Sequence, residues 1–246
     1  MQITPTTLSE IQSLRQLFLH ENNIQFIYNK CHQYGWADTY LITENGKKVG
    51  YGSVYGQNRR EDRDSIFEFY VIPHYRQWAE RYFKALAKIS NTPFIDCQSN
   101  DPLLTRMLYL FAKDIYAERI LFEDHITTQW TVLEAIFRPA RDENEFPGGR
   151  GDADFVVEKN GEIVATGGFY LNYNFPYADF YMETKESFRR QGLGCLMVQE
   201  LKREIYQMGR VPAARCNLNN TASRLTMEKA GMRICGYMLI GKISLT

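Results

Sequence analysis

A strand–turn–strand pattern that occurs twice constrains the fold of this chain more than any other feature. Residues 37–55 and 153–170 each contain two apolar, strand-like runs joined by an Asn-Gly pair, Asn45-Gly46 in the first copy and Asn160-Gly161 in the second. Asn-Gly between apolar runs is the strongest short-range signal of a β-hairpin. The sequence therefore predicts two similar hairpins in different halves of the chain.

The correspondence between the halves continues beyond the hairpins. Several matches in the same order, at a nearly constant offset, indicate a duplicated unit of about half the chain. We therefore expect one domain over residues 1–126 and a second over 127–246. The further matching positions are Phe69–Val71 with Phe180–Met182, Pro93 with Pro212, Cys97 with Cys216, and Asn100 with Asn219.

Hydrophobic periodicity predicts alternating helices and strands in both halves. We expect helices near residues 24–32, 75–90, 102–113, 131–137, 192–207 and 220–230, with another after Thr7. We expect strands near residues 38–44, 48–55, 65–72, 93–98, 118–126, 153–159, 163–171, 177–184, 213–218 and 234–243.

The stretch Phe188–Gly194 is the most informative segment for function, because it lies between a strand-like run and a helical pattern. Amides in the first turn of a helix have no intrahelical partner, and the helix dipole favours negative charge there. Gly192 and Gly194 allow a phosphate to approach the backbone. Arg189 and Arg190 add positive charge. The segment therefore predicts a cradle for a pyrophosphate.

The loop alone does not identify a ligand. A dinucleotide-binding fingerprint needs a third glycine and a later acidic residue, and a Walker loop needs Gly-Lys-Ser/Thr, and neither pattern fits here. A plain turn before a helix remains the alternative interpretation. The residues that follow the loop decide between the two.

A second motif follows at residues 219–232, where Asn220 can cap a helix and Gly231 can end it. Together the two motifs resemble the GNAT N-acetyltransferase superfamily. Its acyl-CoA loop has the form Q/R-x-x-G-x-G/A, and its last helix often reads N-x-x-A/S followed by E-K-x-G-F. The matching residues here are Arg189–Gly194, Asn220, Ser223, Glu228, Lys229 and Gly231, with Met232 in place of the phenylalanine.

The resemblance implies an α/β (α+β) fold with two tandem GNAT-like domains, each with a mixed, mostly antiparallel central sheet flanked by helices. The two copies differ at the loop, where Trp78 and Glu80 stand near the positions of Gly192 and Gly194. An indole blocks close approach to the backbone, and a carboxylate repels phosphate. We therefore expect that the first domain has a degenerate loop and does not bind acyl-CoA; the alternative is a site with unusual residues.

The resemblance implies transfer of an acetyl group from acetyl-CoA to a primary amine of a small molecule or peptide. The amine attacks directly in a ternary complex, without an acyl-enzyme. A backbone N–H near the end of the strand before the loop is expected to stabilise the oxyanion. The residues expected to contact the cofactor are Met182, Glu183, Thr184, Arg189, Arg190, Gln191, Gly192, Leu193, Gly194, Cys195, Asn217, Asn220 and Ser223.

The resemblance does not assign the groups that transfer protons. The family usually has a tyrosine as general acid at the position of Met227, and methionine cannot donate a proton. Tyr237 on the last strand is a possible substitute, and water is another. Strand periodicity places Asp179, Tyr181 and Glu183 on one face. Glu183 is the first candidate for the general base and Asp179 the second. The alternative for both is a solvated or salt-bridged carboxylate.

Three further groups near the expected site have both a functional and a structural interpretation. The Cys195 thiol, at the start of a helix, could have a lowered pKa, or could be a packing residue. Tyr170, Tyr173, Phe175 and Tyr177 form either an aromatic wall for the acceptor or ordinary packing. Arg138, Arg141 and Arg150 either bind an acidic acceptor group or are solvated loop charges.

Charge and composition exclude several classes of function. The chain has 29 Lys and Arg and 29 Asp and Glu, so its net charge is zero, which argues against a broad nucleic-acid or membrane-surface role. There is no apolar run of about 20 residues and no signal-peptide pattern at the amino terminus. Five scattered cysteines without a CxxC pair suggest reduced thiols. We therefore expect a cytoplasmic protein that binds no metal; a homodimer is left open.

Two other functions remain open. The departure at Met227 and the degenerate first half suggest a non-catalytic acyl-CoA-binding or sensing protein. Transfer onto a protein or an aminoacyl-RNA is a third possibility, and the neutral net charge gives no support to the RNA version.

Overall fold

The computed structural model describes residues 1–22, 24–26, 29–56, 59, 62–142, 144–147, 149 and 151–245. The chain forms two compact units, and neither is a continuous stretch of sequence. The first consists of Met1–Ile24, Tyr28–Arg119 and Gly236–Thr246, and the second of Gln25–Ile27 and Ile120–Cys235. These residue ranges differ from the expected domains, which were continuous and met between residues 126 and 127.

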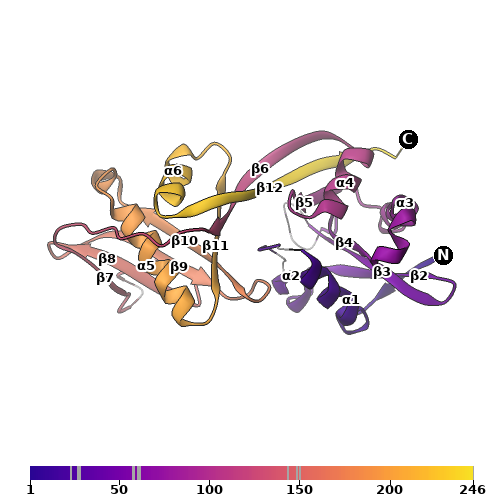
Figure 1. Ribbon diagram of the computed structural model, residues 1–246, viewed down its shortest axis with the longest axis horizontal. Helices are drawn as coiled ribbons and strands as arrows, with labels where there is room; N and C mark the ends of the chain where they lie inside the picture. Colours follow the sequence, from indigo (N-terminus) through magenta and orange to yellow (C-terminus); the bar gives the residue numbers. More distant parts are fainter. Residues whose placement is uncertain are drawn as a thin grey trace. The chain divides into compact units, whose positions relative to one another are not determined.

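The first unit has a mixed sheet in the strand order β1-β2-β3-β4-β5-β12-β6 (Figure 1). Helices α3 and α4 bury Phe83, Leu86, Leu104 and Leu108 in one core cluster with sheet residues. The strands are β1 (Gln2–Thr6), β2 (Asp38–Glu44), β3 (Lys47–Tyr55), β4 (Ser65–Val71), β5 (Phe94–Gln98), β6 (Ala112–Asp124) and β12 (Met232–Ile243). The helices are α1 (Leu8–Glu21), α2 (Asn29–Gln33), η1 (Pro73–Trp78, 3-10), α3 (Ala79–Ser90) and α4 (Pro102–Phe111).

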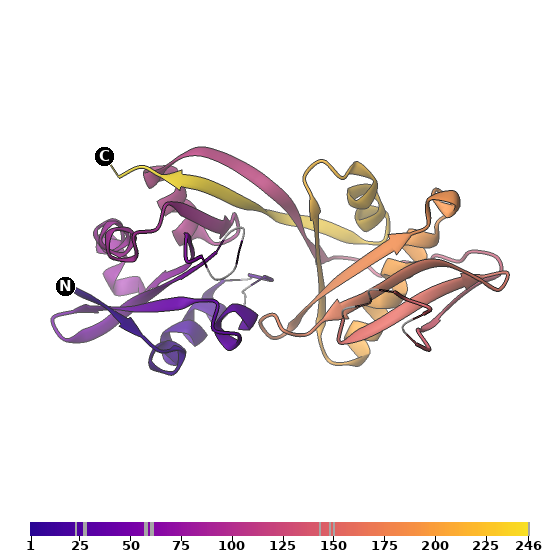
Figure 2. The same cartoon turned by 180° about the vertical axis from the view of Figure 1, so that it is seen from behind.

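The second unit has a mixed sheet in the order β6-β11-β10-β9-β8-β7. Helix α5 covers one face of this sheet in Figure 1, and the strands lie in front of it in Figure 2. Its residues Met197, Val198 and Leu201 belong to the same buried cluster as Val164 and Phe169 of β9. The elements are β7 (Ala135–Pro139), β8 (Ala153–Lys159), β9 (Glu162–Tyr170), β10 (Tyr177–Thr184), η2 (Glu186–Phe188, 3-10), α5 (Leu193–Gln207), β11 (Val211–Asn217) and α6 (Thr221–Lys229).

Both predicted hairpins are confirmed. Strands β2 and β3 join through Asn45 and Gly46, whose φ angles are 51° and 75°. Strands β8 and β9 join through Asn160 and Gly161, with φ angles of 52° and 78°. Positive φ at both central residues is the requirement of a type I′ turn, which explains why Asn-Gly occurs at both places.

Each unit takes one strand from the other half of the sequence. In the first unit, β5 pairs antiparallel with β12, so that Cys97 lies opposite Leu239 near the end of the chain. In the second unit, β11 neighbours β6, which continues from the last helix of the first half. This exchange is the reason that the units are discontinuous in sequence.

Two of the expected helices differ from the structure. In place of a helix over 131–137, residues Ala135–Pro139 form the edge strand β7, where Phe137 pairs with Val157 and stacks on the ring of Phe155 at 5.0 Å. Pairing with a neighbouring strand here outweighs local helix propensity. Of the helix expected over 24–32, only Asn29–Gln33 is described as helical, and residues 27 and 28 lie outside the described part. Strand β1 was not expected.

No helix in the described part of the chain is long and apolar enough to cross a membrane.

Candidate functional site

The parallel pair β10–β11 is hydrogen-bonded over only a short distance. Residues Tyr177–Asp179 pair with Val211–Ala213, and the recorded register ends there. Strand β10 nevertheless continues to Thr184 and β11 to Asn217. In the described part of the chain, the β10–β11 ladder thus stops at Asp179 and Ala213, although both strands continue, and this is a place where an extended ligand could follow the edge of β10.

The loop after β10 leads into an uncapped helix. Arg190 and Gly192 have φ angles of 63° and 80°, and Gly192 is the N-cap of α5. Among the described residues, no side chain caps this helix end. The N–H groups of Leu193, Gly194 and Cys195 therefore have no intrahelical partner and suit an anion.

Gly194 brings the first turn of α5 close to the end of β10. A Cβ atom on Gly194 would lie 2.9 Å from Met182 Cε, 3.1 Å from Thr226 Cγ2 and 3.4 Å from Thr184 Oγ1. The loop, the end of β10 and helix α6 thus meet at one place. Four residues predicted to contact the cofactor, Met182, Thr184, Gly192 and Gly194, belong to this region.

The charges around the loop come from two elements. Arg189 Nε donates a hydrogen bond to Thr184 O at 3.3 Å and its guanidinium lies 3.8 Å from Glu186. Lys159, at the end of β8, donates to Gln191 Oε1 at 3.2 Å. Lys159 could not be assigned to the site from the sequence, because it is separated from Gln191 by 32 positions in the chain. Together these side chains add positive charge beside the uncapped amides.

The predicted contacts on the last helix have an additional structural role. Asn220 Oδ1 accepts a hydrogen bond from the N–H of Ser223 at 3.0 Å and caps α6, as expected. The backbone N–H of Asn220 donates to Asn217 O at 2.9 Å. These three residues organise the start of α6, and their contact with a cofactor stays a prediction.

The prediction of a lowered pKa for Cys195 is wrong. Burial raises the pKa of this thiol, and the positive charge of Lys229 only partly offsets the effect. The sulfur lies 3.9 Å from Thr226 O, inside the second unit's core cluster. Cys195 is therefore a packing residue, because desolvation of the thiolate outweighs the helix dipole.

The position of the family's usual acid and its candidate substitute lie in different places. Met227, at the position of the family's tyrosine, is 3% exposed and belongs to the core. Tyr237 is in the part of β12 that belongs to the first unit, where its backbone N–H donates to Ser99 Oγ at 2.9 Å. The role of Tyr237 as the acid stays a prediction.

The two candidate bases share a face of β10 but differ in environment. Glu183 is exposed, whereas Asp179 is 6% exposed and lies 2.9 Å from the guanidinium of Arg215. Arg215 also donates to the Tyr173 hydroxyl and lies over the ring of Phe26 at 4.9 Å. Arg215 and Phe26 are neighbours of Asp179 that sequence spacing could not reveal. Asp179 thus fits the alternative to a general base, a salt-bridged carboxylate.

The aromatic residues near β10 do not share one environment. Tyr173 is buried, while Phe175 is 73% exposed under the guanidinium of Arg210. Tyr170 packs on Tyr181 with ring centroids 5.1 Å apart. A single continuous wall formed by Tyr170, Tyr173, Phe175 and Tyr177 does not describe this arrangement.

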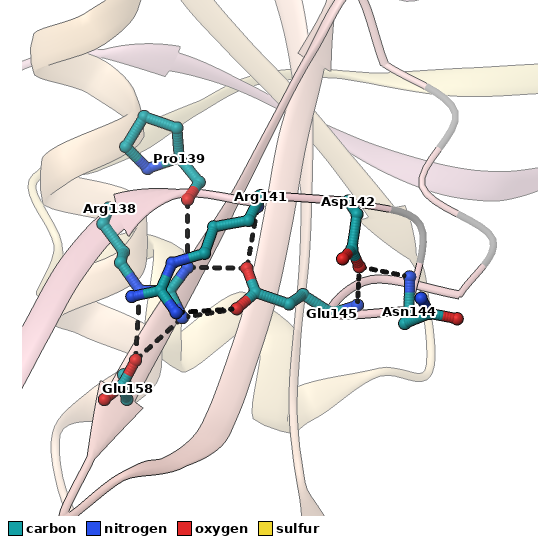
Figure 3. A network of polar contacts seen from close by, with 7 residues as sticks. All are labelled: Arg138, Pro139, Arg141, Asp142, Asn144, Glu145 and Glu158. Carbon is teal, nitrogen blue, oxygen red and sulfur yellow. Dashed lines mark hydrogen bonds and ion pairs between the residues drawn. The ribbon is translucent and has the colours of Figure 1, made fainter.

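Arg138 is held by internal partners (Figure 3). Its guanidinium donates to both oxygens of Glu145 at 2.6 and 2.8 Å, to Glu158 Oε2 at 2.8 and 3.1 Å, and to Pro139 O at 3.1 Å. These contacts engage every nitrogen of a side chain that has five N–H donors. Arg138 therefore fastens the loop after β7 to β8 and is not available to an acidic acceptor. Arg150 lies outside the described residues.

Within the described ranges, no group of three or more His, Cys, Asp or Glu side chains is placed to hold a metal ion.

Comparison with known sequences identifies one family. Residues 179–236, from β10 into β12, match the FR47-like protein family. No curated protein sequence matches the chain.

Several solved structures resemble the chain at low sequence identity. A GNAT-family acetyltransferase from Colwellia psychrerythraea is 13% identical, covers 99% of this chain and 100% of its own, and has a TM-score of 0.79. A tandem GNAT protein from the clavulanic acid biosynthesis pathway is 11% identical, covers 100% and 99%, and has a TM-score of 0.67. A GCN5-related N-acetyltransferase from Sphaerobacter thermophilus is 15% identical, covers 85% and 81%, and has a TM-score of 0.51.

Proposed function

We propose that this chain, whose fold resembles GNAT acetyltransferases and whose residues 179–236 match the FR47-like family, binds acetyl-CoA in its second unit and transfers the acetyl group to a primary amine. The observation that carries this proposal is the position of an uncapped helix N-terminus beside the end of β10, in the part of the strand that lies beyond its short ladder with β11. An anion site and an open strand edge, side by side, suit a ligand with a phosphate group and an extended, amide-bearing arm. Coenzyme A has both.

In this proposal, the pyrophosphate lies against the backbone N–H groups of Leu193–Cys195. Arg189, Arg190 and Lys159 supply positive charge around it. The pantetheine arm runs along the edge of β10 beyond Asp179, where its amides take the place of the missing strand partner. The thioester then lies near Met182–Thr184, and a backbone N–H there stabilises the oxyanion.

The reaction is a direct displacement. The amine nitrogen attacks the thioester carbonyl carbon, the C–S bond breaks, and the sulfur leaves as a thiolate that takes up a proton. Glu183 is the proposed base, because it is exposed on the face of β10 that also carries Asp179. The buried side chain of Met227 cannot donate a proton, so water supplies the proton to the leaving thiolate. We propose a cytoplasmic location and a small-molecule or peptide amine as acceptor.

A second candidate function is a non-catalytic acyl-CoA-binding or sensing protein. Two observations favour it: Met227 is buried in the core, and the Asp179 carboxylate is engaged by Arg215. A sensor would bind acetyl-CoA as tightly as an enzyme but would release no CoA. Turnover therefore separates the two candidates.

The first unit is proposed not to bind acyl-CoA. In it, residues Pro73–Trp78 form a 3-10 helix at the position of the loop, and no positive φ angle occurs among the described residues 73–80. The Glu80 carboxylate, at the start of α3, accepts a hydrogen bond from Arg106. A carboxylate at this helix start opposes a phosphate.

The test uses the full chain, acetyl-CoA and a panel of primary amines, with binding measured by calorimetry and CoA release by a thiol reagent. We expect binding and amine-dependent release. Gly192→Asp places a carboxylate at the anion site and should abolish both. Gly209→Asp is the matched control, because Gly209 also has positive φ, 70° against 80°, but lies at the other end of α5. Unchanged affinity in Gly192→Asp would refute the site, and tight binding without release from any amine would favour the sensor.

A further inference from the structure

The indole of Trp130 connects the loop to the end of helix α6. Its Nε1 donates a hydrogen bond to Lys229 O at 3.0 Å. The opposite edge of the ring lies beside Gly192, where a Cβ atom would stand 3.6 Å from Cε3 and Cζ3 of the indole. Trp130 is half-buried, so part of its ring is accessible to solvent.

The backbone around Trp130 is fastened to α5. The side chain of Gln199 accepts from the Trp130 N–H and donates to Trp130 O at 3.2 Å. Thr128 Oγ1 also donates to Gln199 Oε1, at 3.1 Å. The indole is therefore held in place before any ligand arrives, which lowers the entropic cost of binding against it.

A groove opens next to this ring along α5. Its volume is about 600 Å³, and it is lined by both side chains that contact Gly192, Trp130 and Val132. Further lining residues are Phe137 from β7 and Leu196 and Gln199 from α5. A planar group that enters this groove from the loop would meet the indole first.

The two glycines of the loop face different neighbours, and this gives the bound ligand a direction. Gly194 faces the end of β10, where the pantetheine arm is proposed to lie, whereas Gly192 faces Trp130 and Val132. In coenzyme A the pyrophosphate joins the pantetheine arm to an adenosine. If the arm leaves on the side of Gly194, the adenosine leaves on the side of Gly192.

We propose that Trp130 is the stacking platform for the adenine of the acyl donor, and that the groove along α5 accommodates the nucleotide. This inference rests on the proposed function of the second unit. It adds a binding site for the nucleotide half of that donor, a half that an acyl group on the bare phosphopantetheine arm of a carrier protein lacks. Stacking of a base on an aromatic side chain contributes a factor of roughly five to a hundred in affinity.

The experiment compares two probes by calorimetry on the full chain: acetyl-CoA, and S-acetyl-4′-phosphopantetheine, which lacks the adenosine. We expect Trp130→Ala to weaken acetyl-CoA binding roughly five- to a hundredfold and to leave the affinity for the second probe unchanged. Trp130→Phe keeps an aromatic face and should retain most of the affinity. Trp78→Ala, in the corresponding loop of the first unit, is the matched control and should change neither affinity.

Tryptophan fluorescence gives an independent reading. The chain has three tryptophans, and the other two, Trp36 and Trp78, belong to the first unit. Acetyl-CoA should quench the emission, and the quenching should disappear in Trp130→Phe. Equal loss of both probes in Trp130→Ala, or no loss of either, would overturn the platform while acetyl-CoA binding to the unmodified chain still stands. Failure of the unmodified chain to bind either probe would overturn the proposed function, and this inference with it.

Discussion

The carboxylate of Asp179 lies 2.9 Å from the guanidinium of Arg215. This ion pair distinguishes Asp179 from Glu183, the other acidic residue on the same face of β10. Asp179 is buried and neutralised by a cation, whereas Glu183, four residues further along the same face, is exposed. A buried carboxylate with a fixed counter-ion is a poor proton acceptor, because protonation would remove the negative charge that faces the guanidinium. The structure thus favours a structural role for Asp179.

Replacement of Arg215 by methionine should lower the free energy of unfolding by about 3 kcal/mol, because it leaves a buried carboxylate without its partner. Urea unfolding measures this change. Arg233→Met is the control, since Arg233 pairs with Glu123 but is 57% exposed, and its loss should cost about 1 kcal/mol or less. Adding Asp179→Asn to Arg215→Met should recover part of the loss. Equal effects of the two arginine variants would contradict the buried-pair interpretation.

Glu183→Gln should lower kcat by roughly a hundredfold or more, which is typical for removal of a general base. The affinity for acetyl-CoA should stay the same, because the amide keeps the size of the side chain. Steady-state kinetics and calorimetry on the same preparation separate the two effects. Glu186→Gln is the control: its side chain is 89% exposed and lies just beyond β10. A kcat within twofold of the unmodified chain in Glu183→Gln would exclude Glu183 as the base.

Acid should release the loop that Arg138 fastens. The hydrogen bonds from Arg138, with a further contribution from the Arg141 N–H, lower the pKa of Glu145 from 4.5 to about 2. A depressed carboxyl pKa stabilises the fold above the unfolded-state value and loses that contribution as the pH falls from about 4.5 toward 2. The Arg141 N–H donates to Glu145 at 2.7 Å, so its protection factor, the exchange rate of an unprotected amide at the same pH divided by the observed rate, should fall below pH 4.

Glu145→Gln should lower the protection factor of this N–H at neutral pH and remove its dependence on acid. Glu162→Gln, which removes an exposed partner of Lys185, provides the control and should leave the protection factor unchanged. A protection factor that stays constant down to pH 2 in the unmodified chain would show that Glu145 does not hold this loop.

Cys195 should resist alkylation in the folded protein at pH 8, because burial raises the pKa of its thiol and limits access to it. Mass spectrometry after brief treatment with iodoacetamide locates the modified cysteines. All five cysteines should react in urea, which controls for the reagent. Rapid modification of Cys195 in the folded chain would reinstate it as a reactive thiol of the loop.

The features that could be predicted from the sequence are local ones. Asn45-Gly46 and Asn160-Gly161 specify their turns through their own φ angles, and the spacing of Gly192 and Gly194 indicates an anion-binding helix start. The pairing of Asp179 with Arg215, and of Trp130 with Lys229, joins residues far apart in the chain, and no local pattern encodes it. The predicted pKa of the Cys195 thiol was wrong for a related reason, since the burial that raises it depends on the whole core.

The exchanged strands β6 and β12 carry a consequence for the history of the chain. A gene split between the hairpins would give two products that each lack one strand of their sheet, so neither repeat is an independent module. Selection that preserves the second repeat must also preserve the first, whether or not the first binds anything. In this arrangement, one repeat can lose its ligand-binding or catalytic activity and still be retained in the chain, because the sheet of the other repeat needs one of its strands.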